Sequence, residues 1–138
     1  MSLAQEIITA VTARLSAIPG MSGRVSEWSP STVPDRSLPL IVVRDSRVTV
    51  EAVEMGHRLM MDIEVDIVAA DQPAEVRRLT AAVITAVGTD PQWGGRAMMT
   101  TWQGSELLVD RSSGIIAGAV VRIQIMFRVR EWQPGVRL

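Results

Sequence analysis

The sequence predicts an α+β fold in which two helices pack on one face of a mainly antiparallel sheet. Residues 3–18 and 73–87 repeat apolar side chains at steps of three and four, the spacing of a helix with one buried face. Residues 57–69 and 119–132 alternate apolar and polar side chains, which is typical of strands with one face toward a core. Two helices on one face of an antiparallel sheet would bury all four apolar stripes.

Helix signals flank the N-terminal stretch. Ser2, with Gln5 three residues later, forms a capping box that satisfies free N–H groups of the first turn. Pro19-Gly20 is expected to end the helix. The chain then continues as a short strand (24–28), a loop (29–37) and a buried β-branched strand (38–43).

The middle of the chain changes from strand to helix. The apolar face of the strand at 57–69 consists of Leu59, Met61, Ile63, Val65 and Ile67. The helix at 73–87 carries Val76, Leu79, Val83 and Val87 at helical spacing. Asp71 or Gln72 is expected to cap its start, and Gly88 to end it in a left-handed conformation.

The last third returns to strands. Residues 97–109 form either a pair of strands or one strand bent near Gly104, and residues 110–114 form a turn. The final strand, 119–132, directs Ala119, Val121, Ile123, Ile125, Phe127 and Val129 inward. Pro134-Gly135 is expected to end it.

Composition predicts one domain, residues 1–138, and argues against several function classes. The chain has 138 residues, 47% of them hydrophobic, which is enough for a single core. It has no Cys, one histidine (His57) and no Lys, so thiol chemistry and Cys- or His-rich metal sites are not expected. A net charge of −1 lacks the basic excess of nucleic-acid-binding domains. We therefore expect no enzyme activity, cofactor, metal, specific nucleic-acid partner or membrane span.

Three local features resemble functional sites but have simpler interpretations. Gly94-Gly95-Arg96 is followed by a strand-like segment, whereas a phosphate loop is longer and leads into a helix. His57 enters a strand without a GxSxG elbow, so we interpret it as an edge residue. The four tryptophans, which either anchor an interface or cover the edge of the core, are Trp28, Trp93, Trp102 and Trp132.

Charged residues on the polar faces of the two long strands form the candidate subunit interface. They are Asp62, Glu64 and Asp66 on one strand and Arg122, Arg128 and Arg130 on the other. Opposite charges across paired strands stabilise a sheet by about 0.2–1 kcal/mol. This ladder is either a salt-bridge set within one subunit or an orienting contact between subunits. A second candidate is the stretch 45–56, a hairpin arm or mobile loop that carries Arg47, Glu51 and Glu54.

The order of segments resembles that of a known family. A helix ending in PG precedes the strand LPLIVVR, a long alternating strand enters DIVAAD, the helix QPAEVRRLTAAVITAVGTDP follows, and VVRIQIMFRVREWQPG closes the chain. This pattern resembles the tail terminator proteins of long-tailed bacteriophages and prophages, the lambda-type minor tail family. It covers nearly the whole chain in order and segment character, and no motif transfers residue by residue.

The resemblance implies a non-enzymatic structural protein that forms a hexameric ring. Such a ring caps the tail tube, ends its polymerisation and allows head joining. The implied partners are further copies of the chain, the tail tube protein and a head–tail connector protein. The implied location is the bacterial host cytoplasm during assembly and then the virion tail or neck. Two alternatives stay open: another phage neck or head-completion protein, and a small-ligand-binding α+β domain.

Overall fold

The computed structural model describes residues 2–28, 38–70, 73–110 and 116–138. The element order is α1 (Leu3–Ser16), β1 (Val25–Glu27), β2 (Leu40–Val53), β3 (Gly56–Ala70), α2 (Pro73–Gly88), β4 (Met99–Asp110), β5 (Ile116–Arg130) and β6 (Gln133–Arg137). The predicted α+β fold is confirmed. The Ser2 half of the predicted capping box is confirmed, because the Ser2 hydroxyl accepts a hydrogen bond from the Gln5 N–H at 3.1 Å. The Gln5 side chain instead donates to the Thr9 hydroxyl and the Glu27 carboxylate.

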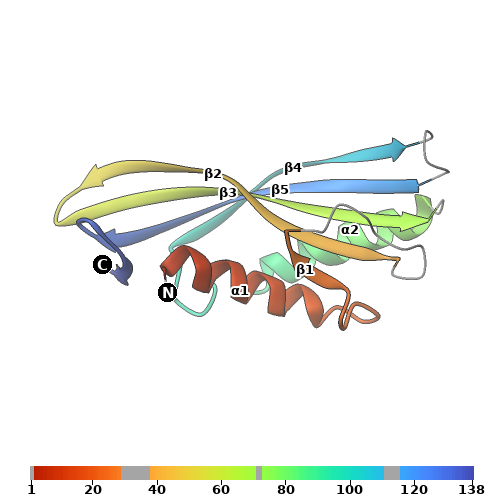
Figure 1. Cartoon of the computed structure of the whole chain (residues 1–138), viewed down its shortest axis with the longest axis horizontal. Coiled ribbons are helices and arrows are strands. Elements are labelled where there is room, and N and C mark those ends of the chain that lie inside the picture. The colour runs from red at the N-terminus through yellow and green to blue at the C-terminus, as the bar shows by residue number, and fades with distance from the viewer. Residues whose placement is uncertain (1, 29–37, 71–72, 111–115) are drawn as a thin grey trace.

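The strands form one six-stranded sheet in the order β1-β2-β3-β5-β4, with β6 paired to β5. All neighbours are antiparallel except β1, which runs parallel to β2. Figure 1 shows a long, twisted sheet with both helices on the same side. The β2–β3 hairpin extends beyond the helices at one end of the molecule, so its tip has no helical cover (Figure 1).

The core lies between the helices and one face of the sheet. Apolar residues of β3 face apolar residues of β5 in register, as in the pairs Met61–Ile125 and Ile63–Ile123. The apolar stripes of both helices are buried against this face. Because side chains alternate along each strand, the opposite face of the sheet, called here the outer face, carries the polar residues of β3 and β5.

Both helix ends differ from the sequence-based expectation. α1 ends at Ser16 instead of residue 18, with Ala17 as its C-cap, although Ile18 is still buried. Gly88 is the last residue of α2 and has no positive φ, so its assignment as a left-handed terminator is wrong. The Arg14 guanidinium donates to the Val87 carbonyl at 3.2 Å, and the Thr89 hydroxyl donates to the Ala86 carbonyl at 2.7 Å. These bonds satisfy carbonyls that a glycine cap would otherwise serve.

Three strands differ in extent from the prediction. β2 continues to Val53, so the stretch 45–56 is a hairpin arm. β4 is one strand with a bulge between Trp102 and Gly104, which agrees with the bent alternative. β5 ends at Arg130, and residues after a tight turn form β6 where an end was expected at Pro134-Gly135. Proline is tolerated there because β6 is a short, exposed strand at the margin of the sheet.

Some predicted features lie outside the described residues. They are the loop at 29–37, the caps Asp71 and Gln72, and most of the turn at 110–114. Within the described ranges, no helix is both long and apolar enough to cross a bilayer.

Candidate functional site

The outer face carries a charged ladder whose members pair within one subunit. Arg44 on β2 lies 2.8 Å from Glu64 and 2.8 Å from Asp66, two residues on one face of β3. Arg122 on β5 approaches Glu64 from the other side at 3.7 Å. Asp62 accepts a hydrogen bond from the Gln124 amide at 3.0 Å. The three carboxylates of β3 are therefore matched by polar groups of both neighbouring strands rather than arranged around a cation.

The sequence-predicted arginines of β5 divide into two groups. Arg122 lies opposite Glu64 and also reaches Glu106 of β4 at 3.3 Å. Arg128 instead lies opposite Arg58, and Arg130 lies opposite Gly56 at the end of the sheet. Of these three β5 arginines, only Arg122 contacts an acidic residue of β3 in the structure. Arg128 and Arg130 lie instead toward the end of the sheet that carries the hairpin arm.

Two members of the ladder, Arg44 and Glu106, were missing from the sequence-based set. Arg44 follows the buried run Ile41–Val43, and continued alternation from that run would have placed it on the outer face. Glu106 lies on β4 after the bulge. A bulge changes which side chains face outward, so the position of Glu106 could not be read from alternation alone.

The hairpin arm contains the second predicted set of charged residues. Glu51 of β2 pairs with Arg58 of β3, and Arg47 lies 3.6 Å from Asp62. Glu54 is exposed at the turn, next to Met55, whose φ is +65°. The arm is therefore an ordered hairpin held by cross-strand pairs.

An apolar groove lies on the helix side of the arm. It measures about 440 Å³ and includes Val50, His57, Leu59, Trp132 and Pro134 in its lining. Val50 is 57% exposed and Trp132 is 82% exposed. His57 packs edge-on against the Trp132 ring, with ring centroids 5.1 Å apart. These residues continue the apolar face of the sheet past the ends of the helices, which leaves that face uncovered.

The opposite edge of the sheet carries a second exposed apolar set. On β4, Trp102 is 55% exposed and Leu107 is 48% exposed, and both line a groove of about 380 Å³ beside α2. Among the described residues, no strand pairs with the far side of β4 or with β2 beyond Val43. The sheet thus has two open edges, each flanked by exposed apolar side chains.

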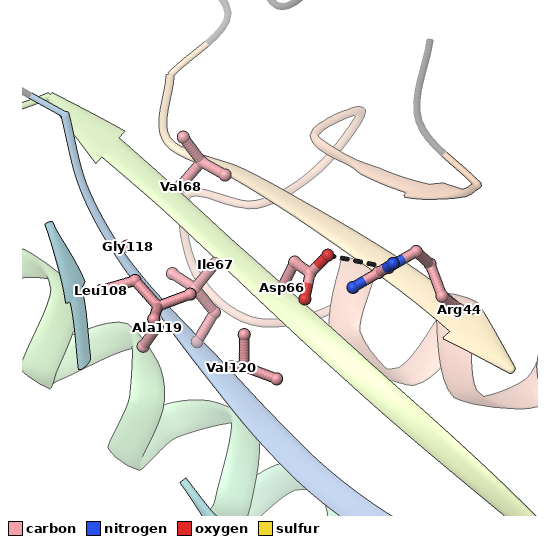
Figure 2. Close-up of a pocket in the computed structure, with 8 residues that line it drawn as sticks. All are labelled: Arg44, Asp66, Ile67, Val68, Leu108, Gly118, Ala119 and Val120. Atoms are coloured by element: carbon pink, nitrogen blue, oxygen red, sulfur yellow. Dashed lines mark ion pairs between the residues drawn. The ribbon is translucent and has the colours of Figure 1, made fainter. Parts of the chain in front are cut away.

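A smaller hollow on the outer face, shown in Figure 2, lies beside the charged ladder. Its volume is about 260 Å³, and its lining is mainly aliphatic. The side chain of Asp66 points toward Arg44, the only charged partner among its lining residues (Figure 2). A Cβ added to Gly118 would lie 2.7 Å from the Ile67 carbonyl oxygen, so β3 and β5 approach each other closely there. The one carboxylate of this lining, Asp66, is paired with Arg44, and the other lining residues carry no side chain that could act as a nucleophile or general base.

The loop after α2 is held rigidly by Asp90 and Trp93. The Asp90 carboxylate accepts hydrogen bonds from the N–H groups of Gly94 at 2.7 Å and Gln92 at 3.1 Å. These bonds, supplemented by the nearby Arg14 guanidinium, lower the pKa of Asp90. Burial lowers the pKa of Arg14, whose guanidinium stacks 3.7 Å from the centre of the Trp93 ring.

The four tryptophans therefore divide between the two roles that were predicted. Trp93 is 1% exposed and belongs to the core, where its indole N–H donates to the Thr100 hydroxyl at 2.8 Å. Trp28, Trp102 and Trp132 are exposed. Only these three are available as anchors of an interface.

Comparisons with known proteins show that the fold is shared with solved structures. No protein-family model matches the chain, and no curated protein matches it by sequence. A chain in the solved structure of the virion of a native gene transfer agent (GTA) particle is similar, with a TM-score of 0.59 and 17% sequence identity. The match covers 91% of this chain and 91% of that chain. At this identity the similarity establishes a shared fold.

Proposed function

We propose that this chain is a structural protein of a phage-like particle that assembles as a ring, caps the tail tube, ends its polymerisation and allows head joining. The observation that carries the proposal is the similarity in fold, over 91% of both chains, to a component of a gene transfer agent virion. The order of segments, which resembles that of tail terminator proteins, supports the finer assignment. The proposed partners are further copies of the chain, the tail tube protein and a head–tail connector protein.

The two open sheet edges supply a physical route to a ring. Unpaired strand edges tend to pair with another chain unless they are covered or protected. Here one edge is β2 beyond Val43 and the other is β4, so a contact between the β2 edge of one copy and the β4 edge of the next is heterologous. Heterologous contacts produce a ring when their rotation closes. The apolar groove of the arm and the exposed Trp102 and Leu107 would add buried apolar area to this pairing.

The charged ladder has a secondary role in this proposal. Its carboxylates are already paired inside one subunit, so a neighbouring subunit would gain little from contacting them. Its exposed margins, Arg47 on the β2 side and Glu106 on the β4 side, lie near the two open edges and are of opposite charge. They can orient neighbouring subunits and affect the specificity of pairing more than its affinity.

The proposed role is structural rather than catalytic. In the part of the chain that the structure describes, His57 contacts an aromatic ring, and no three His, Asp or Glu side chains gather as a metal site. A head-completion or connector protein of the same fold is the nearest alternative. It would also form rings, but it would not stop the growth of a tail tube.

Sedimentation velocity and light scattering test the ring. We expect the parent protein to form a species of six times the 15.1 kDa chain mass, seen as closed rings by negative-stain electron microscopy. Val50→Glu on the arm and Leu107→Glu on β4 should each abolish rings, because each buries a charge in the proposed contact. Both positions are exposed in the subunit, so the fold should be unaffected. Thr85→Glu, at an exposed position of α2, is the matched control and should assemble normally.

Mixing the two variants distinguishes a heterologous contact from a symmetric one. Each variant keeps one intact edge, so an equimolar mixture should form heterodimers that cannot grow into rings. Rings in either single variant would contradict the proposed edges. Failure of the parent rings to block elongation of the partner tube protein would instead favour the connector alternative.

A further inference from the structure

Three arginines from separate parts of the chain line one pocket at the end of the sheet that carries the arm. They are Arg96 from the loop after α2, Arg128 from β5 and Arg137 from β6. The pocket measures about 300 Å³, and the rest of its lining consists of Gly95, Ala97, Met98 and Leu138, so no acidic side chain lines it. Within the described ranges, none of these arginines belongs to an ion pair. The pocket therefore concentrates positive charge in a protein whose net charge is −1.

Two of the three guanidinium groups are held in place by backbone carbonyls. Arg96 donates from one terminal nitrogen to the Trp93 carbonyl at 3.1 Å, and Arg137 donates from one terminal nitrogen to the Gly95 carbonyl. The loop that supplies these carbonyls is anchored by the buried Trp93 ring and by the Asp90 carboxylate. Each guanidinium thus loses one donor to the loop and keeps others for a ligand.

Arg128, the third arginine of the pocket, is not held by a backbone carbonyl of the described residues. It lies directly opposite Arg58 in the β3–β5 register, and Arg58 is engaged by Glu51. The Arg128 Nε atom is buried without a hydrogen-bond partner among the described residues. Buried donors are nearly always satisfied in proteins, and an exception often marks a missing water or ion. An anion in the pocket would satisfy the charge of Arg128 and offset its repulsion by Arg58.

We propose that this pocket binds a phosphate-type oxyanion. The three guanidinium groups come from separate segments, and the tetrahedral oxygens of a phosphate accept hydrogen bonds in several directions, whereas the two oxygens of a carboxylate lie in one plane. Arginine side chains bind phosphate oxygens in bidentate geometry more readily than lysine does. The source is either free phosphate or a phosphodiester of a nucleic-acid backbone. Both present anionic oxygens that accept hydrogen bonds from guanidinium groups, although the diester carries a single charge. This site is independent of the ring contact proposed above, because it uses neither Val50 nor the exposed side chains of β4.

Titration of isotopically labelled full-length protein with inorganic phosphate, followed by NMR, tests the site. In low-salt, chloride-free buffer we expect saturable shifts of the Arg96, Arg128 and Arg137 Nε–H signals and of the Trp93 indole N–H. The double variant R96Q/R137Q should weaken the apparent affinity by at least about tenfold, because it removes two charge-assisted hydrogen-bond donors. The matched control R77Q/R78Q removes the same charge from exposed positions on α2 and should leave the affinity unchanged.

Parallel titrations identify the source of the phosphate and the outcome that overturns the site. Competition by a short single-stranded DNA supports a backbone phosphate, and binding of phosphate without DNA competition supports a free anion. No saturable shift, or equal affinity in the double variant, overturns the proposal. Tighter binding of an oligo-glutamate peptide than of phosphate also overturns it, in favour of a carboxylate partner. If the double variant does not fold, R96Q alone serves, since Arg96 is exposed and contacts the rest of the protein mainly through its own loop.

Discussion

Replacing Trp93 should reveal how strongly one buried side chain supports both the core and the loop of the oxyanion site. Trp93 is 1% exposed, donates to the Thr100 hydroxyl at 2.8 Å and carries the Arg14 guanidinium 3.7 Å from its ring centre. Truncating a buried aromatic residue to alanine costs about 3–5 kcal/mol. The lost hydrogen bond adds about 1 kcal/mol, and the lost cation–π contact adds about 0.5–2 kcal/mol. These contributions overlap, so we expect Trp93→Ala to cost about 4–5 kcal/mol in total.

Trp93→Phe is the matched variant. It keeps an aromatic face for Arg14 and much of the buried area, but it removes the donor to Thr100. We therefore expect a loss of about 1.5–2.5 kcal/mol. For a chain of this length, each kcal/mol corresponds to about 3–4 °C in melting temperature. Trp93→Ala should thus lower the melting temperature by about 15 °C, and Trp93→Phe by about half as much or less.

Urea unfolding at a concentration where the chain is monomeric provides the measurement, because assembly would otherwise add to the apparent stability. The critical result is that Trp93→Ala loses more unfolding free energy than Trp93→Phe. If Trp93→Ala cost less than about 2 kcal/mol, or if Trp93→Phe cost as much as Trp93→Ala, burial of this ring would not be the dominant contribution. Trp93→Phe should also retain phosphate binding, whereas Trp93→Ala should weaken it by loosening the loop that holds Arg96.

Two further predictions concern the backbone and the response to acid. Gly118→Ala should lower the free energy of unfolding by about 1–3 kcal/mol, because the added Cβ would lie 2.7 Å from the Ile67 carbonyl oxygen. Gly88→Ala, at the end of α2 with open space around it, should be neutral or stabilising by up to about 1 kcal/mol. Equal effects of the two variants in thermal unfolding would contradict the close approach of β3 and β5. Since the pKa of Asp90 is lowered in the folded state, its contribution to stability is present above its unfolded value of 3.8 and is lost as pH falls through the lower folded pKa. Asp90→Asn should therefore have a lower free energy of unfolding than the parent at neutral pH, and this difference should shrink as the pH is lowered toward about 2. A difference in unfolding free energy that does not change with pH would show that the Asp90 charge does not stabilise the loop.

Side-chain periodicity alone was sufficient to predict the α+β class of the fold. The helical stripe at 73–87 and the alternation at 57–69 and 119–132 each describe a segment that buries one face, and such local patterns keep their meaning in any tertiary arrangement. The same patterns correctly predicted a polar outer face with Asp62, Glu64 and Asp66 in a row. Ser2 could also be identified as a cap, since its partner is only three residues away.

Prediction was less successful where the outcome depends on neighbours distant in sequence. β2 extends to Val53 because β3 pairs with it along the arm, although residues 45–53 have few core anchors of their own. β6 forms despite Pro134 because the edge of β5 at Val129 and Arg130 is not paired with β4 and is available to β6. Gly88 stays helical because carbonyls near the end of α2 are satisfied by Arg14, which lies on the other helix. In each case a long-range contact outweighs the local signal.

Charge partners likewise depend on register and on loop paths. Alternation assigned Arg122 and Arg128 to the same face, but only the β3–β5 register decides that one lies opposite Glu64 and the other opposite Arg58. Arg96, Arg128 and Arg137 come from three segments, and no spacing in the chain relates them. The sequence by itself determined which residues face the core and which face water, because that choice follows from hydrophobicity and local period. Only the tertiary structure decided which charged groups meet, because electrostatic pairing depends on distances that the folded sheet and the anchored loop create.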